Sequence, residues 1–140
     1  MRVPSAVPRD NCVGGLYQAV PLDTAENRRD DACSREEPDL AVIRGSARAY
    51  LERHPDGADA LLVVEIAKSS QERDRAKAAD YARGCVPIYR LLDITARTLE
   101  VYSEPDGDRC RYRRFASLSD ADEVGLPELV ERWNVASLLP

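Results

Sequence analysis

The stretch ADALLVVEIAKSSQERDRAKAADYARGCVPIYRLLD, residues 58–93, decides the fold of this chain. It opens with a continuous apolar run, which is typical of a strand buried on both faces, and we expect a central strand over residues 58–67. Ser69 followed three residues later by Glu72 is a capping-box pattern, which predicts the start of a helix. That helix is expected to end at a cap formed by Gly84.

Further strands are predicted on both sides of this segment. Residues 86–93 read as a strand, so that strand, helix and strand together predict a parallel βαβ unit. Residues 96–103 and 109–116 are expected to continue as antiparallel strands, with a turn signal, PDGD, at 105–108. Upstream, residues 39–44 form a short strand. The predicted fold class is mixed α/β (α+β): a mixed central sheet, one main helix and a C-terminal antiparallel meander.

The length and composition suit one soluble domain. The chain has 140 residues, of which 44% are hydrophobic and 32% charged, and this is enough to bury a real core. We expect a disordered terminus over residues 1–12, a single domain over residues 13–140, and a C-terminal tail that covers the sheet as a short strand or helix. The net charge of -5 argues against a protein that grips nucleic acid through bulk positive charge. A nuclease stays compatible with it, because a carboxylate cluster that binds cations is itself acidic.

Cysteine usage bears on the compartment. The four cysteines are scattered without a CxxC pair, and the chain has one histidine, which argues against a structural zinc site. No signal peptide and no apolar run of membrane-spanning length is recognised. We therefore expect reduced thiols and a cytoplasmic location.

Glu65 raises the question of function, because it ends the buried apolar run. A carboxylate there is costly unless something pairs with it. Lys68 is the nearest cation in the sequence, but side chains alternate along a strand and Lys68 is expected on the opposite face. Lys77 lies inside the predicted helix, with Asp74 and Tyr81 three and four residues away on the same helical face. The spacing therefore favours Lys77 over Lys68 as the partner.

Asp39 opens the strand that precedes the Glu65 strand. If these strands are neighbours, the two carboxylates converge. Two carboxylates with water and a backbone carbonyl suit Mg²⁺, with Mn²⁺ as a second candidate. Such an ion activates water for phosphodiester hydrolysis, and a nearby lysine orients the water or stabilises the developing charge. The competing interpretation of Glu65 is a structural ion pair.

The segments EPDLAVIRG, YLERHP, LLVVEIA through VPIYRLLD, and LEVYSEP resemble the Uma2 family of endonucleases in the PD-(D/E)xK restriction-endonuclease-like superfamily. The resemblance covers residues 16–140. It implies that Asp39 and Glu65 are metal ligands, and that Lys77 is the catalytic lysine, moved from the strand to the following helix. It also implies a metal-dependent endonuclease that hydrolyses DNA. A homodimer would suit the cleavage of both strands of a duplex on symmetry grounds.

Two departures from the family pattern define an alternative. The chain has Ile-Tyr-Arg at residues 88–90, where family members usually carry Glu-Tyr-Trp, and only 38 residues precede Asp39. The alternative is an N-terminally shortened, catalytically impaired remnant that acts as a binding or interaction module. A basic run places Arg109, Arg111 and Arg113 on one strand face. This run is either a phosphate contact or, more commonly, the charged guard of an edge strand.

Overall fold

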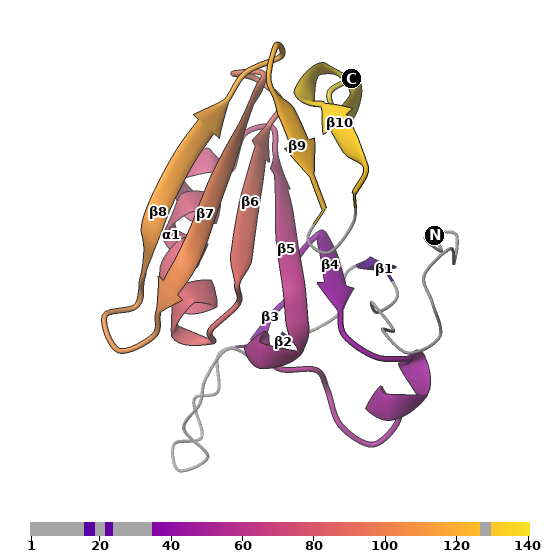
Figure 1. The fold of residues 1–140 in the computed structure, drawn as a ribbon. Helices are drawn as coiled ribbons and strands as arrows, with labels where there is room; N and C mark the ends of the chain where they lie inside the picture. The colour runs from indigo at the N-terminus through magenta and orange to yellow at the C-terminus, as the bar shows by residue number, and fades with distance from the viewer. Residues whose placement is uncertain (1–15, 19–21, 24–34, 127–129) are drawn as a thin grey trace.

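The computed structural model describes residues 16–18, 22–23, 35–126 and 130–140. Its main sheet has six strands in the order β1-β4-β5-β6-β7-β8, and the helix α1 lies against one face of it (Figure 1). The predicted disordered terminus lies outside the described residues. The main elements are β1 (Leu16–Gln18), β4 (Leu40–Ile43), β5 (Ala60–Ala67), α1 (Gln71–Arg83), β6 (Ile88–Asp93), β7 (Thr98–Asp106) and β8 (Arg111–Leu118).

Shorter elements surround this sheet. Two antiparallel pairs are formed by β2 (Leu22–Asp23) with β3 (Arg35–Glu36) and by β9 (Glu123–Gly125) with β10 (Arg132–Asn134). The 3₁₀ helices are η1 (Ala47–Tyr50), η2 (Gly57–Asp59) and η3 (Val135–Leu138). Val135 packs with Leu92 and Leu99 in one apolar cluster. The prediction that the tail covers the sheet is thereby confirmed.

The predicted βαβ unit is present. β5 pairs with β6 in parallel, and α1 connects them. The other pairings of the main sheet are antiparallel, including the predicted β6–β7 hairpin and the β7–β8 pair. The first half of β5 is buried on both faces, as its apolar run predicts, but Ile66 near its end is 40% exposed. Ile66 therefore reaches solvent on one face of the strand, while Glu65 and Ala67, on the other face, are buried.

A row of aromatic rings holds α1 on the sheet. The Tyr81 ring on α1 lies 4.8 Å from the Tyr89 ring on β6, and the Tyr89 ring lies 5.4 Å from the Tyr102 ring on β7. Tyr81 and Tyr89 are fully buried in the cluster that also contains Val63 and Leu91. Rings with these separations pack favourably. This packing turns one stripe of α1 toward the end of β5.

The start of α1 differs from the prediction. The capping box between Ser69 and Glu72 is wrong, because the N-cap residue is Ser70 and it makes no side-chain cap hydrogen bond. The Ser70 hydroxyl instead donates to the side chain of Asp74. The predicted C-terminal cap at Gly84 is confirmed.

The predicted turn at 105–108 starts too early. Pro105 and Asp106 continue β7 and lie opposite Tyr112 and Arg111 of β8. β7 therefore extends past Pro105. Pro105 lies near the end of the strand, at the margin of the sheet, where the missing backbone N–H donor of proline is tolerated.

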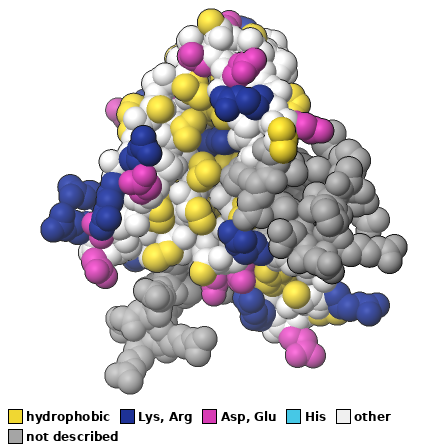
Figure 2. Space-filling model, in the orientation of Figure 1, with side chains coloured by type: hydrophobic (Ala, Val, Ile, Leu, Met, Phe, Trp, Pro, Cys, Tyr) yellow, Lys and Arg dark blue, Asp and Glu magenta, His cyan; other side chains and the backbone are white. Residues whose placement is uncertain are grey.

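β8 is an edge strand of the main sheet, and basic side chains lie along that edge with acidic ones among them (Figure 2). Arg113 pairs with Asp106 at 3.3 Å, and Arg114 pairs with Glu104 at 3.2 Å. These pairs are typical of an edge strand whose charged side chains prevent pairing with another chain. A contact with DNA at this strand stays a prediction. Across the described ranges, the structure contains no helix that is long and apolar enough to cross a membrane.

Candidate metal and lysine site

Asp39 and Glu65 come from neighbouring strands. β4 and β5 are antiparallel with Leu40 opposite Val64, so Asp39, one residue earlier, lies beside Glu65. Asp39 Oδ2 accepts a hydrogen bond of 2.7 Å from the backbone N–H of Ile66. This bond fixes the Asp39 carboxylate against β5, next to the residue that carries the second carboxylate. The two strands are therefore neighbours, which is the condition for the expected convergence of the two carboxylates.

Glu65 is held by two donors from α1. Lys77 Nζ lies 3.1 Å from Glu65 Oε1, and the Tyr81 hydroxyl donates to the same oxygen at 2.8 Å. Glu65 is only 3% exposed. The helix thus supplies the partners that a buried carboxylate requires.

Lys68 takes no part in this arrangement. Its side chain is exposed, while its carbonyl accepts hydrogen bonds from Gln71 and Thr95. Ala67, which follows the Glu65 face two residues on, is fully buried. The structure therefore places Lys77, and not the nearer Lys68, against Glu65.

Asp74, which helical spacing placed on the same face as Lys77, also contacts the lysine in this site. Its Oδ1 lies 3.3 Å from Lys77 Nζ, and the residue is 3% exposed. The signal for it was the spacing of three residues to Lys77, which places both on one helical face. Lys77 is thus held between two carboxylates, one from β5 and one from its own helix.

Burial and ion pairing shift the pKa values of Glu65 and Lys77 in opposite directions. Burial raises the pKa of Glu65, and the nearby Asp39 charge raises it further, while the bonds from Tyr81 and Lys77 offset part of the effect. Burial alone would lower the pKa of Lys77, but the contacts with Glu65 and Asp74 raise it above its ordinary value. Burial affects the pKa of Glu65 more than that of Lys77, because the Glu65 side chain is 3% exposed and the Lys77 side chain is 21% exposed. Lys77 is therefore an ammonium ion at neutral pH.

Each of the two carboxylates has one oxygen that accepts no hydrogen bond within the described residues. Within the described residues, no hydrogen bond reaches Asp39 Oδ1 or Glu65 Oε2, since the donors engage the other oxygen of each group. Nowhere in the described ranges do three or more His, Cys, Asp or Glu residues gather in a way that could hold a metal ion. Two oxygen ligands with the rest supplied by water fit Mg²⁺, which usually binds through one or two carboxylates. The donor set therefore fits Mg²⁺ or Mn²⁺ and does not fit a structural zinc site.

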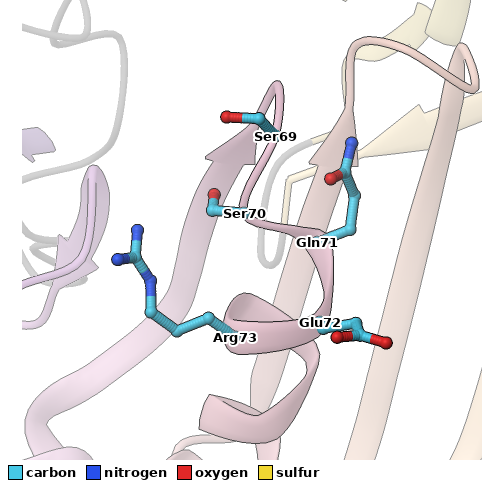
Figure 3. Close-up of a pocket in the computed structure, with 5 residues that line it drawn as sticks. All are labelled: Ser69, Ser70, Gln71, Glu72 and Arg73. Carbon is cyan, nitrogen blue, oxygen red and sulfur yellow. The ribbon is translucent and has the colours of Figure 1, made fainter.

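A polar hollow of about 550 Å³ opens at the start of α1 and is lined by Ser69, Ser70, Gln71, Glu72 and Arg73. Figure 3 shows Ser70 and Arg73 on the side of β5, and Glu72 directed away from it. Because the Ser70 hydroxyl also contacts Asp74, the hollow adjoins the residues that surround Lys77.

Comparison with known proteins assigns the chain to a family. The sequence pattern of the Uma2 family, described as "Putative restriction endonuclease", matches residues 17–138. The chain belongs to the Uma2 family. Asp39, Glu65 and Lys77 lie inside the matched range. No protein with a curated description matches this Uma2 chain in sequence.

A solved structure has the same fold. It is described as a "putative nuclease belonging to DUF820" from Anabaena variabilis ATCC 29413, with 13% sequence identity and a TM-score of 0.56. The alignment covers 94% of the Uma2 chain and 65% of the solved chain. At this identity the likeness concerns the fold alone. It confirms the predicted fold class, a mixed sheet with one main helix.

Proposed function

We propose that this Uma2 protein is a metal-dependent endonuclease that hydrolyses DNA phosphodiester bonds. The observation that carries the proposal is the contact of Glu65 with Lys77 beside Asp39, at the end of β5. A buried ion pair alone would serve structure. A second carboxylate next to it, with an uncommitted oxygen on each, is better suited to a cation.

Asp39 and Glu65 are the residues that would hold Mg²⁺, or Mn²⁺ in its place. When bound, the ion would supply Lewis acidity toward the phosphate and a water of lowered pKa. Tyr81 and Lys77 fix Glu65 through one oxygen, so that the other keeps a defined direction. Asp39 is fixed in the same way through the N–H of Ile66. Such preorganisation is what a metal site needs from the residues around it.

Lys77 is proposed to stabilise charge rather than to remove a proton. It is held as an ammonium ion by two carboxylates, so it has no free lone pair with which to act as a base. A fixed positive charge in a partly buried site stabilises the negative charge that develops on a phosphate during hydrolysis. The same ammonium can orient the attacking water through a hydrogen bond.

The proposed substrate is DNA, and the proposed location is the cytoplasm. The location is proposed from cysteine usage, because the four cysteines of the sequence are scattered without a CxxC pair, which suits reduced thiols. A homodimer remains a proposal from symmetry, and light scattering of the purified protein at assay concentration tests it.

The test is cleavage of supercoiled plasmid in Mg²⁺, in Mn²⁺ and in EDTA. We expect nicking that requires a divalent ion and is lost in Glu65→Ala. Glu100→Gln is the matched control, because Glu100 is also buried, at 7% exposed, but lies on β7, two strands from β5, and pairs with Arg75. The control is expected to cleave.

Two results would count against the proposal. If the native protein fails to cleave with either ion, the enzyme proposal is wrong and the alternative of a binding or interaction module is favoured. Cleavage that survives Glu65→Ala would show that the site has been assigned to the wrong residues.

A further inference from the structure

We infer that Asp74 is a positioning residue, which holds the Lys77 ammonium in place against Glu65. The inference rests on the nuclease function proposed above for its catalytic meaning. Asp74 touches neither of the proposed metal ligands in the contacts of the described residues; it acts through Lys77.

Both oxygens of the Asp74 carboxylate have a partner. Oδ1 lies 3.3 Å from Lys77 Nζ, and Oδ2 accepts a hydrogen bond from the Ser70 hydroxyl. This use of both oxygens distinguishes Asp74 from Glu65, which engages its donors through one oxygen only. Asp74 is therefore arranged to direct a cationic side chain rather than to bind an ion.

The backbone of Asp74 is also fixed. The Tyr89 hydroxyl, from β6, donates to the Asp74 carbonyl at 2.6 Å, and the Asp74 N–H donates to the Ser70 carbonyl at 2.9 Å. With 3% of the residue exposed, little freedom remains for its side chain. A carboxylate held this firmly gives Lys77 one preferred direction.

The helical spacing brings the four groups into one line. Residues 70, 74, 77 and 81 follow each other at intervals of four, three and four, so their side chains lie along one stripe of α1. The stripe runs from Ser70 through Asp74 and Lys77 to Tyr81, and the last two contact Glu65.

The Lys77 side chain requires a second contact to hold one position. A lysine side chain has many rotamers and binds as a point charge without a preferred geometry. With Glu65 as its only anchor, the ammonium could move around that carboxylate. A second anchor on the same helix restricts it before substrate arrives, which lowers the cost of placing the charge during the reaction.

The side-chain mobility of lysine tests this directly, because the sequence contains just two lysines, Lys68 and Lys77. Protein labelled with ¹³C-lysine gives two ε-methylene signals in NMR, and Lys68→Arg assigns them. We expect Lys77 to be rigid and the exposed Lys68 to be mobile in the native protein. In Asp74→Asn, the mobility of Lys77 should rise toward that of Lys68, because Glu65 is then its only anchor, while Lys68 stays unchanged.

Asp80→Asn is the matched control on the same helix, since Asp80 pairs with Arg83 at 3.2 Å and lies off the stripe. It should leave Lys77 rigid. In cleavage assays we expect Asp74→Asn to lower kcat roughly 10- to 100-fold, the range for a misplaced reacting group, with KM for DNA unchanged. Asp80→Asn should keep both constants. If Asp74→Asn does not fold, Ser70→Ala replaces it, with Lys77 again becoming more mobile.

The inference is overturned if Lys77 stays as rigid in Asp74→Asn as in the native protein, or if Asp80→Asn frees Lys77 to the same degree. A native protein without cleavage would refute the nuclease proposal, but the NMR result would still decide whether Asp74 positions Lys77. The two failures are therefore distinguishable.

Discussion

Lys77 Nζ lies 3.1 Å from Glu65 Oε1, although twelve residues separate the two in the chain. β5 delivers the carboxylate, and α1 folds back along the sheet to deliver the ammonium. The geometry depends on the βαβ connection and on the tyrosine rings that pack α1 against β6. The ion pair is thus a product of the tertiary fold rather than of local sequence.

The two lysines should respond differently to loss of charge. Lys77→Met is expected to reduce plasmid cleavage by roughly 10²- to 10³-fold, the usual effect of removing one group that stabilises developing charge. Lys68→Met should cleave like the native protein, because Lys68 is exposed at the end of β5. Cleavage rates at saturating DNA measure both. Equal losses in the two variants would contradict the assignment of Lys77.

Tyr81→Phe should cost more stability than Tyr89→Phe. The Tyr81 hydroxyl donates to a buried carboxylate, and such bonds are worth about 1.5–3 kcal/mol. The Tyr89 hydroxyl donates to a backbone carbonyl, where a neutral bond is worth about 0.5–1.5 kcal/mol. Urea unfolding of both variants gives the comparison. A larger loss in Tyr89→Phe would mean that Tyr81 does not hold Glu65 as described.

Gly57 marks a close approach of two backbone segments. A Cβ at Gly57 would lie 1.8 Å from the carbonyl oxygen of Gly84, the residue that caps α1. Gly57→Ala is therefore expected to destabilise the protein by about 3 kcal/mol or more, at the upper end of the range for overpacking. Gly45→Ala is the control. Gly45 has φ of +85, and a Cβ there would meet the Tyr50 hydroxyl at 3.9 Å, an ordinary contact, so we expect only the left-handed strain of about 1–2 kcal/mol. Thermal unfolding in which Gly57→Ala loses no more than Gly45→Ala would contradict this packing.

Acid should remove the contribution of the ion pair between Asp59 and Arg53. The hydrogen bond from Arg53, at 2.7 Å, lowers the pKa of Asp59 in spite of partial burial. Because the folded pKa lies below the unfolded one, the pair adds stability above the unfolded pKa and loses it as the pH falls through the folded pKa, below about pH 4. The stability difference between native protein and Asp59→Asn should therefore shrink from pH 7 to pH 3. A difference that is independent of pH would show that the Asp59 charge is not involved.

The main elements of the fold could be predicted from local sequence. The apolar run before Glu65 and the turn signals between the later strands predict β5, α1 and the meander, because burial and chain reversal leave marks in neighbouring residues. The start of α1 was harder to predict from the sequence. Ser69 and Glu72 have capping-box spacing, yet Ser70 is the N-cap residue and its hydroxyl turns to Asp74, a choice that depends on which side chains are buried.

The candidate site could be predicted only in part from the sequence. Period-two alternation favoured Lys77 over Lys68, and both the position of Asp39 at a strand start and the resemblance to Uma2 pointed to Asp39. The role of Asp74 could not be predicted, because helical spacing places it near Lys77 without showing that it is buried or that Ser70 occupies its second oxygen. The hydrogen bond from the N–H of Ile66 to Asp39 depends on strand pairing. That pairing brings together residues far apart in the chain.

The most direct test of the central claim is a crystal structure grown with Mn²⁺, with anomalous diffraction used to locate the ion. We expect a peak bound by Asp39 and Glu65, at about 2.1 Å from one oxygen of each carboxylate. The same peak should be absent from crystals of Glu65→Ala. A native crystal that contains Mn²⁺ elsewhere but not between these two carboxylates would contradict the account.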